Sequence, residues 1–224
     1  MTITYHRDLV QGSDEWLAAR CGMITASEMH LLLTEKRLTP AANDKQRAHL
    51  YELAAQRITQ HVEPHYVSDD MLRGHEDEAE ARILYAEHYA PVREVGFVTN
   101  DSFGFTLGCS PDGLVGDDGQ IEIKSRRQKG QIETILGLGV PAGYMLQIQT
   151  ALLVTGRAWL DFISYSGGLP MVVCKVWPDA EIQAAILEAA GAAEKAISKM
   201  VADFKVKSRG LIPTERRVEQ EMVV

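Results

Sequence analysis

The segment that decides the fold runs from Ser110 to Lys124 and reads SPDGLVGDDGQIEIK. Residues 116–119, GDDG, predict a tight hairpin, because Asp-Gly supplies the positive φ that such turns require. Residues 121–124, IEIK, alternate strictly between apolar and charged side chains, which is typical of a strand. Both isoleucines would then face the core, and Glu122 and Lys124 would share the other face.

Asp112 follows Pro111 on the strand that precedes the hairpin turn. The turn folds the Asp112 carboxylate back beside Glu122, so two carboxylates and the ammonium of Lys124 converge on one patch. An isolated Glu-x-Lys pair is usually just a solvated strand face. Here the rigid loop SPDG at 110–113 fixes a carboxylate at the end of a strand, which favours a functional cluster.

This combination of side chains suits phosphodiester hydrolysis. Carboxylate oxygens bind the hard cations Mg²⁺ and Mn²⁺, and Mg²⁺ usually retains several waters. Such an ion lowers the pKa of a bound water and neutralises charge on the phosphate, and a second ion can stabilise the leaving oxygen. A nearby lysine can act as a point charge at the transition state. We therefore expect Asp112, Glu122 and the Ile123 carbonyl to be metal ligands.

The regions on either side of the hairpin differ in their periodicity. Apolar residues recur at helical spacing through most of the first ninety residues and at strand-like spacing around the hairpin. The predicted helices span residues 13–20, 43–61, 69–89, 141–154 and 179–204, and a further short helix is predicted to begin at Thr25 or Ser27. The predicted strands span residues 92–99, 103–107, 121–124, 158–165 and 171–177. This order predicts an α/β (α+β) fold with a central mixed β-sheet flanked by helices.

A chain of 224 residues with this order is expected to form one domain. Its parts would be a mostly helical region at 1–90, a sheet core at 91–178 and a C-terminal helix and tail at 179–224. Hydrophobic residues make up 46% of the chain, which is enough for a substantial core. No apolar stretch reaches the roughly 18–20 residues of a membrane span, and no secretory signal opens the chain. We expect a cytoplasmic protein with no membrane partner.

The positions of the cysteines and histidines and the net charge of the chain exclude or disfavour several classes of function. Cys21, Cys109 and Cys174 lie far apart, and the seven histidines form no HExxH motif, which argues against a disulfide framework and against zinc hydrolysis. The net charge of −8 argues against nucleic acid as a partner. Two features would reconcile that charge with DNA binding: basic groups gathered on one face, and acidic groups that bind metal ions.

The order of the motifs is more specific than any one of them. Pro111-Asp112 followed by Glu122-Ile123-Lys124 resembles the signature of the PD-(D/E)xK nuclease superfamily. A wider set of blocks, in family order over roughly residues 11 to 165, resembles the lambda-type (YqaJ-like) viral recombination exonucleases. These blocks are Gln11-Gly12, Glu15-Trp16, Arg20, Gly22, Ile24-Thr25-Ala26-Ser27-Glu28, Gly74, Glu78, Ser110-Pro111-Asp112-Gly113-Leu114, Glu122-Ile123-Lys124 and the run from Tyr144 to Gln149.

The resemblance implies a 5′-to-3′ exonuclease that acts on linear double-stranded DNA and releases 5′-mononucleotides. It implies Mg²⁺, with Mn²⁺ as a substitute, at two ions per site. It also implies a homotrimeric ring that works beside a single-strand annealing protein in phage-type recombination, within a bacterial host cell. The whole chain would then be a single nuclease domain.

The resemblance also assigns roles to individual residues. The metal-site acids would be Glu78, Asp112 and Glu122, joined by the Ile123 carbonyl, with Lys124 as the catalytic lysine and Gln147 as an active-site support. Arg20, Ser27 and Ser110 would bind the terminal 5′-phosphate. Arg37 and Met71 fall where the family touches or wedges the duplex. Arg126 and Arg127 belong to a basic run after the active strand, and we expect them to contact the DNA backbone.

Several of these residues have a simpler interpretation. Glu78 lies on an acidic helix face, and such a face is usually solvated. Gln149 is a rival for Gln147, and the two point in different directions on a helix, so only one reaches the site easily; we favour Gln147. Arg20 could merely close its helix favourably. Ser27 could be an N-cap, which is compatible with anion binding because a helix N-terminus attracts anions.

Two other functions compete with the exonuclease. A structure-specific or restriction-type endonuclease of the same superfamily would cut closed circular DNA, which an end-dependent exonuclease would not. A non-catalytic DNA-end-binding module would carry a degenerate site. The complete set of Glu78, Asp112, Glu122 and Lys124 argues against that module.

Overall fold

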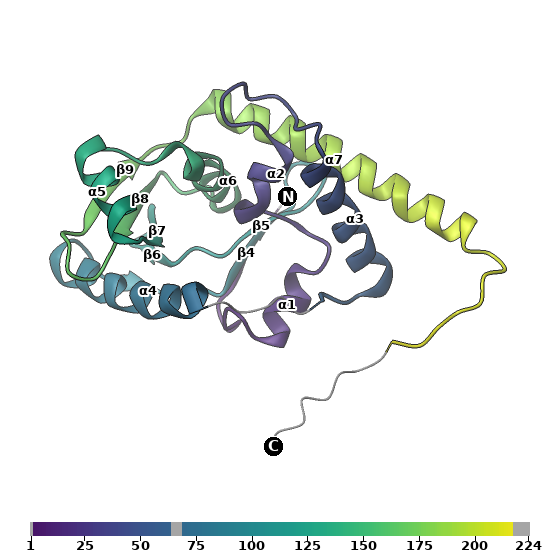
Figure 1. The fold of residues 1–224 in the computed structure, drawn as a ribbon, viewed down its shortest axis with the longest axis horizontal. Helices are drawn as coiled ribbons and strands as arrows, with labels where there is room; N and C mark the ends of the chain where they lie inside the picture. Colours follow the sequence, from purple (N-terminus) through teal and green to yellow (C-terminus); the bar gives the residue numbers. More distant parts are fainter. Residues whose placement is uncertain (1, 64–68, 217–224) are drawn as a thin grey trace, which may run out of the picture.

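The computed structural model describes residues 2–63 and 69–216, which form two β-sheets flanked by helices (Figure 1). The first sheet has the order β1-β4-β5-β2, with strands Ile3–His6 (β1), Phe97–Asn100 (β4), Leu107–Cys109 (β5) and Ile24–Thr25 (β2). The second has the order β3-β6-β7-β8-β9, with strands Val92–Arg93 (β3), Gly113–Val115 (β6), Gly119–Ser125 (β7), Trp159–Tyr165 (β8) and Val172–Val176 (β9). Each sheet combines antiparallel and parallel pairs. The predicted α/β fold is confirmed, with the strands divided between two mixed sheets.

The helices are capped by the residues that the sequence offers for that purpose. They are Asp14–Arg20 (α1), Met29–Leu32 (α2), Asp44–Thr59 (α3), Asp69–His88 (α4), Gln128–Gly137 (α5), Met145–Thr155 (α6) and Ala180–Lys207 (α7), with 3-10 turns at Ala26–Glu28 (η1) and Ala142–Tyr144 (η2). Ser13, Asn43 and Asp179 accept hydrogen bonds from backbone N–H groups at the starts of α1, α3 and α7. In the described ranges no single helix is long and apolar enough to cross a membrane, although α5 and η2–α6 reach that length and composition as a bent pair.

The hairpin forms as predicted. Strands β6 and β7 pair in antiparallel fashion with Gly113 opposite Ile121, and Gly116 adopts a left-handed φ of 52° in the turn. The buried side chain of Arg157 donates hydrogen bonds to the carbonyls of Gly116 and Gly119. This contact fixes the turn and therefore the register that places Asp112 opposite Glu122.

Side chains along each strand of the second sheet alternate between two faces, and both faces are covered by helices. On one face, Ile121, Ile123 and Ile163 pack against Ala81 and Tyr85 of α4. On the other face, the main core contains side chains of α6, α7, α2 and α3. Because Glu122 alternates with the two isoleucines of β7, it lies on the face that α6 covers.

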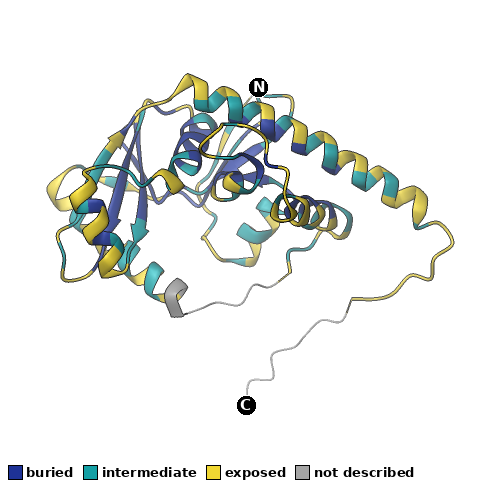
Figure 2. Cartoon of the chain, turned by 45° about the horizontal axis from the view of Figure 1, so that its top comes forward, coloured by how far each residue is buried: buried dark blue, intermediate teal, exposed yellow. Residues whose placement is uncertain are grey.

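Helix α7 starts against this main core and continues beyond it. Its last buried residue is Ile197, ten positions before the helix ends at Lys207. Figure 2 shows the far end of the helix as exposed.

The connection between the two sheets positions a candidate site residue. The chain crosses from the first sheet to the second between Cys109 and Gly113, and Asp112 lies in that crossing.

The structure differs from the local predictions in several places, and the predicted strand 92–99 is divided between β3 and β4, which belong to different sheets. Strand β1 lies in the region predicted as helical, because Ile3 pairs with Asn100, far away in the sequence. Residues 103–106 form a turn before β5 instead of a strand, and Gly104 there has a left-handed φ of 80°. Helix α5 was not predicted. The helix expected after Thr25 or Ser27 is only η1 followed by the four-residue α2, and among the described residues neither side chain caps it.

Candidate active site

The predicted catalytic cluster is assembled, and it is more buried than a strand face would be. Asp112 accepts a hydrogen bond from the Ile123 backbone N–H (2.6 Å). One Glu122 carboxylate oxygen lies 2.7 Å from Lys124 Nζ and accepts a hydrogen bond from Gln147 Nε2 (2.5 Å). Relative exposures of 9% for Asp112 and 4% for Glu122 rule out the solvated strand face. Burial of three charged groups costs solvation energy, and this cost has to be offset by attraction and hydrogen bonds between the groups.

Electrostatic effects show how closely the charges interact. Burial raises the pKa of Asp112 well above its ordinary value, and the neighbouring Glu122 and Glu78 carboxylates raise it further. Burial likewise raises the pKa of Glu78. For Lys124, burial is the largest single influence and lowers the pKa, but Glu122, Asp112 and Glu78 together raise it above its ordinary value. Lys124 is therefore a cationic hydrogen-bond donor and not a base.

The donor chemistry of this cluster fits a divalent cation. Within residues 2–63 and 69–216, no three His, Cys, Asp or Glu side chains are grouped so that they could hold a metal ion. The oxygens of Glu122 and Asp112 are engaged instead with Lys124, Gln147 and the Ile123 N–H. Nevertheless, the Glu122 and Glu78 carboxylates both raise the pKa of Asp112, so the three carboxylates interact, and carboxylate oxygens are the ligands that Mg²⁺ and Mn²⁺ prefer.

Glu78 is half-buried on α4, so it is not simply part of a solvated acidic face. One helical turn further, Arg82 donates from Nε to the Asp112 carbonyl (2.9 Å) and pairs through Nη1 with Glu94 (3.1 Å). Arg82 therefore ties the helix that carries Glu78 to the loop that carries Asp112. Arg82 was not among the residues predicted from the sequence, although its spacing of four from Glu78 places both side chains on one helix face.

The structure separates the two glutamines as the helical spacing predicted. Gln147 donates to Glu122, as described above. Gln149 is buried on another side of α6, where it donates to the Trp177 carbonyl (2.8 Å) and accepts from the Asp179 N–H (2.8 Å). Gln149 therefore serves as a structural link to the start of α7.

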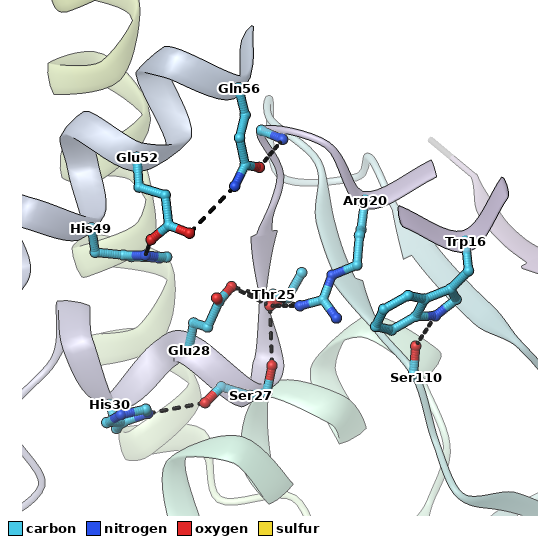
Figure 3. Close-up of polar contacts among 11 residues, drawn as sticks. Trp16, Arg20, Thr25, Ser27, Glu28, His30, His49, Glu52, Gln56 and Ser110 are labelled. Atoms are coloured by element: carbon cyan, nitrogen blue, oxygen red, sulfur yellow. Dashed lines mark hydrogen bonds and ion pairs between the residues drawn. The ribbon is translucent and has the colours of Figure 1, made fainter. Parts of the chain in front are cut away.

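The residues predicted to bind a terminal phosphate lie around Arg20 at the end of α1 (Figure 3). The Arg20 guanidinium lies over the Trp16 ring, 4.3 Å from its centroid. Trp16 Nε1 in turn donates to Ser110 Oγ (2.9 Å). Burial lowers the pKa of Arg20, and the Glu28 and Glu52 carboxylates counteract that effect. Ser27 is exposed within the short turn η1, so it does not cap a helix, and binding by a helix N-terminus is not supported there.

One cavity of about 180 Å³ joins the two groups of residues. Its lining includes the phosphate-binding candidates Arg20, Ser27 and Ser110 and the catalytic candidates Asp112, Glu122, Lys124 and Gln147. These residues come from α1, η1, the crossing between the sheets, β7 and α6. The cavity therefore places two cations, Arg20 and Lys124, near enough to contact one small phosphate-bearing ligand.

The remaining DNA-contact predictions concern residues outside this cavity. Arg126 donates to the Tyr144 hydroxyl (2.6 Å), and Arg126 and Arg127 line a separate cavity of about 500 Å³ with Arg73. Arg37 is exposed in the turn after α2 and is not among the described residues that line either cavity. The Met71 side chain lies outside the described part of the structure.

Comparisons with known proteins identify the family of the chain. Residues 15–158 match the model of the YqaJ-like viral recombinase domain. The alkaline exonuclease LHK-Exo from Laribacter hongkongensis is 33% identical, with a TM-score of 0.79 over 89% of this chain and all of that one. A structure of LHK-Exo in complex with dAMP matches over the same shares at 34% identity and the same TM-score.

A phage-related exonuclease from Haemophilus somnus 129PT is 13% identical, with a TM-score of 0.61 over 81% of this chain and 96% of that one, and at that identity it shows likeness of fold only. Among curated protein sequences, none gives a significant match to the chain.

Proposed function

The chain belongs to the YqaJ-like viral recombinase domain family, and from this premise we propose that it is a divalent-metal-dependent exonuclease that degrades linear double-stranded DNA from the 5′ end. The products would be 5′-mononucleotides. The observation that carries the proposal is the single cavity lined by both Arg20 and the Asp112–Glu122–Lys124 cluster. A cavity that holds a terminal phosphate beside the reacting phosphate suits release of one nucleotide at a time. That a similar exonuclease was solved with dAMP, a mononucleotide, supports this product.

The metal ions would be held by Asp112, Glu122, Glu78 and the Ile123 carbonyl. When bound, two Mg²⁺ or Mn²⁺ ions supply an activated water and neutralise charge on the reacting phosphate. Lys124 stays protonated beside Glu122 and donates to a phosphate oxygen where negative charge develops. Gln147 and the Ile123 N–H hold the carboxylates of Glu122 and Asp112 in fixed orientations.

The end requirement predicts a sharp difference between DNA topologies. With Mg²⁺ present, linear duplex should be digested completely, while covalently closed circular duplex should remain intact, because a closed circle offers no terminal phosphate to Arg20. Gel analysis of both substrates in one reaction, with the linear form cut from the same plasmid, gives the answer. Cutting of the closed circle would favour an endonuclease, and binding of both forms without turnover would favour a non-catalytic end-binding module.

We further propose that the protein acts as a homotrimeric ring in the cytoplasm of a bacterial host, beside a single-strand annealing protein. A ring reconciles a net charge of −8 with DNA binding, since basic groups that line a channel act locally. The exposed end of α7 supports self-association, because apolar side chains are exposed there and just beyond it, at Phe204, Val206, Leu211 and Ile212.

The ring makes a simple prediction about mass. Light scattering after size exclusion should return three times the chain mass of 24.8 kDa, the mass of the trimer that the resemblance to the lambda-type exonucleases implies. A Phe204→Glu variant should shift the mass towards the monomer if the α7 end contributes to the contact. A monomer mass for the unaltered protein at micromolar concentration would remove the ring from the account.

A further inference from the structure

Thr25 occupies a central position in the pocket around Arg20, although it does not itself carry charge (Figure 3). It lies at the end of β2 and is only 3% exposed. Its hydroxyl oxygen lies 2.8 Å from Glu28 Oε2, 3.3 Å from Arg20 Nη2 and 3.3 Å from Ser27 Oγ. The Thr25 hydroxyl therefore contacts two of the residues predicted to bind the phosphate, Arg20 and Ser27, and also the Glu28 carboxylate.

The direction of each hydrogen bond follows from the number of protons available. A hydroxyl group donates once and accepts twice. The Glu28 carboxylate only accepts, so Thr25 gives its proton to Glu28. The Arg20 guanidinium only donates, so Thr25 accepts from Arg20 and, with its second lone pair, from Ser27. Glu28 thus orients Thr25 so that both of its lone pairs face Arg20 and Ser27.

The backbone beside Arg20 is fixed independently. Gly22, with a left-handed φ of 68°, donates from its N–H to Gln56 Oε1 (2.7 Å), and its carbonyl accepts from Arg57 Nε (2.7 Å). Arg57 is itself held by a bidentate pair with Glu194 of α7. With the main chain held in this way, three contacts decide where the Arg20 guanidinium lies: the Trp16 ring, the Thr25 hydroxyl and the Glu28 carboxylate, whose Oε2 is 3.8 Å from Arg20 Nη2.

We propose that Thr25, oriented by Glu28, is a positioning residue for recognition of the 5′-phosphate. It retains one N–H of Arg20 and leaves the other guanidinium donors available to the cavity, and it holds the Ser27 hydroxyl beside them. This inference rests on the proposed function, because it assumes that Arg20 and Ser27 bind the terminal phosphate. It adds a residue that would set the preference for phosphorylated ends without touching the phosphate.

The test compares Thr25→Val, which keeps the shape and removes the hydroxyl, with Thr25→Ser, which keeps the hydroxyl. Thr134→Val is the matched control, since Thr134 is equally buried at 3% and its hydroxyl donates to the Gly130 carbonyl within α5. Each full-length variant is assayed on linear duplex with 5′-phosphate and with 5′-hydroxyl ends. Binding of both duplexes is also measured in EDTA, where hydrolysis does not interfere.

We expect Thr25→Val to lower the phosphate-to-hydroxyl rate ratio and the corresponding affinity ratio by about tenfold, the size of one hydrogen bond to a charged group. The rate on 5′-hydroxyl ends should fall much less, since that terminus offers the pocket no anion. Thr25→Ser and Thr134→Val should keep the wild-type ratios. A melting temperature for each variant separates a loss of folding from a loss of recognition.

Two results would overturn the proposal. Equal losses on both substrates with Thr25→Val, or an unchanged ratio, would make Thr25 a packing residue of β2. A phosphate-to-hydroxyl ratio of one for the unaltered protein would show that the pocket does not recognise the phosphate, and the role of Thr25 would fail together with the pocket. That outcome is distinct from failure of the proposed nuclease function. Digestion of linear duplex by the unaltered protein tests the nuclease function separately.

Discussion

Lys124→Ala should slow hydrolysis of linear duplex DNA by about a hundred- to a thousandfold and leave the protein folded. Lys124 Nζ lies 2.7 Å from Glu122, and both side chains line the cavity that we assign to the reacting nucleotide. A preorganised donor aimed at a developing negative charge contributes about 2.7–4 kcal/mol to the barrier difference, which gives this range. Single-turnover rates measured at saturating Mg²⁺ would isolate the chemical step from binding and product release.

The carboxylates of the same cluster should be at least as sensitive. Asp112→Ala and Glu122→Ala each remove a proposed metal ligand, so we expect hydrolysis to be lost, and EDTA should have the same effect on the unaltered protein. Lys199→Ala is the matched control for Lys124→Ala, because Lys199 also pairs with a carboxylate but is 75% exposed on α7. Digestion by Lys124→Ala at a rate close to that of the Lys199→Ala control would show that the catalytic assignment is wrong.

Arg20→Ala should slow digestion of 5′-phosphorylated duplex by roughly ten- to a hundredfold, because a hydrogen bond to a charged group contributes about 1.5–3 kcal/mol. The planar guanidinium is permanently charged and suited to grip a phosphate with two donors. On 5′-hydroxyl ends the loss should be much smaller, since that terminus offers the arginine no anion. The measurement is a two-by-two comparison of unaltered protein and Arg20→Ala on both kinds of end.

The control for this experiment is Arg47→Ala, which removes an exposed arginine that pairs with Asp44 on the same helix, α3. Arg20 also packs on the Trp16 ring, so thermal melting of both variants must accompany the rates. Equal losses on the two substrates would assign Arg20 to folding or to general backbone contact. The nuclease proposal would survive that result, and the phosphate pocket would not.

The parts of the site that the sequence predicts are those set by local rules. The alternation of residues in IEIK correctly predicted that Ile121 and Ile123 face the core and that Glu122 lies on the opposite face. The Asp-Gly turn correctly predicted that Asp112 lies across the hairpin from Glu122. Helical spacing separated Gln147 from Gln149 correctly. In each case, a few consecutive residues determine the direction of a side chain.

What the sequence did not reveal depends on contacts between distant segments. Strand β1 exists because Ile3 and its neighbours pair with β4, and no periodicity within residues 3–6 indicates that partner. The depth of Glu122 depends on α6 packing over its face of the sheet. Arg82 acquires its role only when α4 lies beside the Asp112 loop. Tertiary packing decided each of these features.

The most direct test of the central claim is the order in which labelled ends leave a linear duplex in Mg²⁺. With one strand labelled at its 5′-terminal nucleotide or, in a separate sample, at its 3′-terminal nucleotide, products are resolved over time. We predict immediate release of the 5′ label as a mononucleotide and late release of the 3′ label. Neither label should be released in EDTA, and with Lys124→Ala both should be released about a hundred- to a thousandfold more slowly. Early release of the 3′ label, or of the 5′ label within longer oligonucleotides, would contradict this prediction.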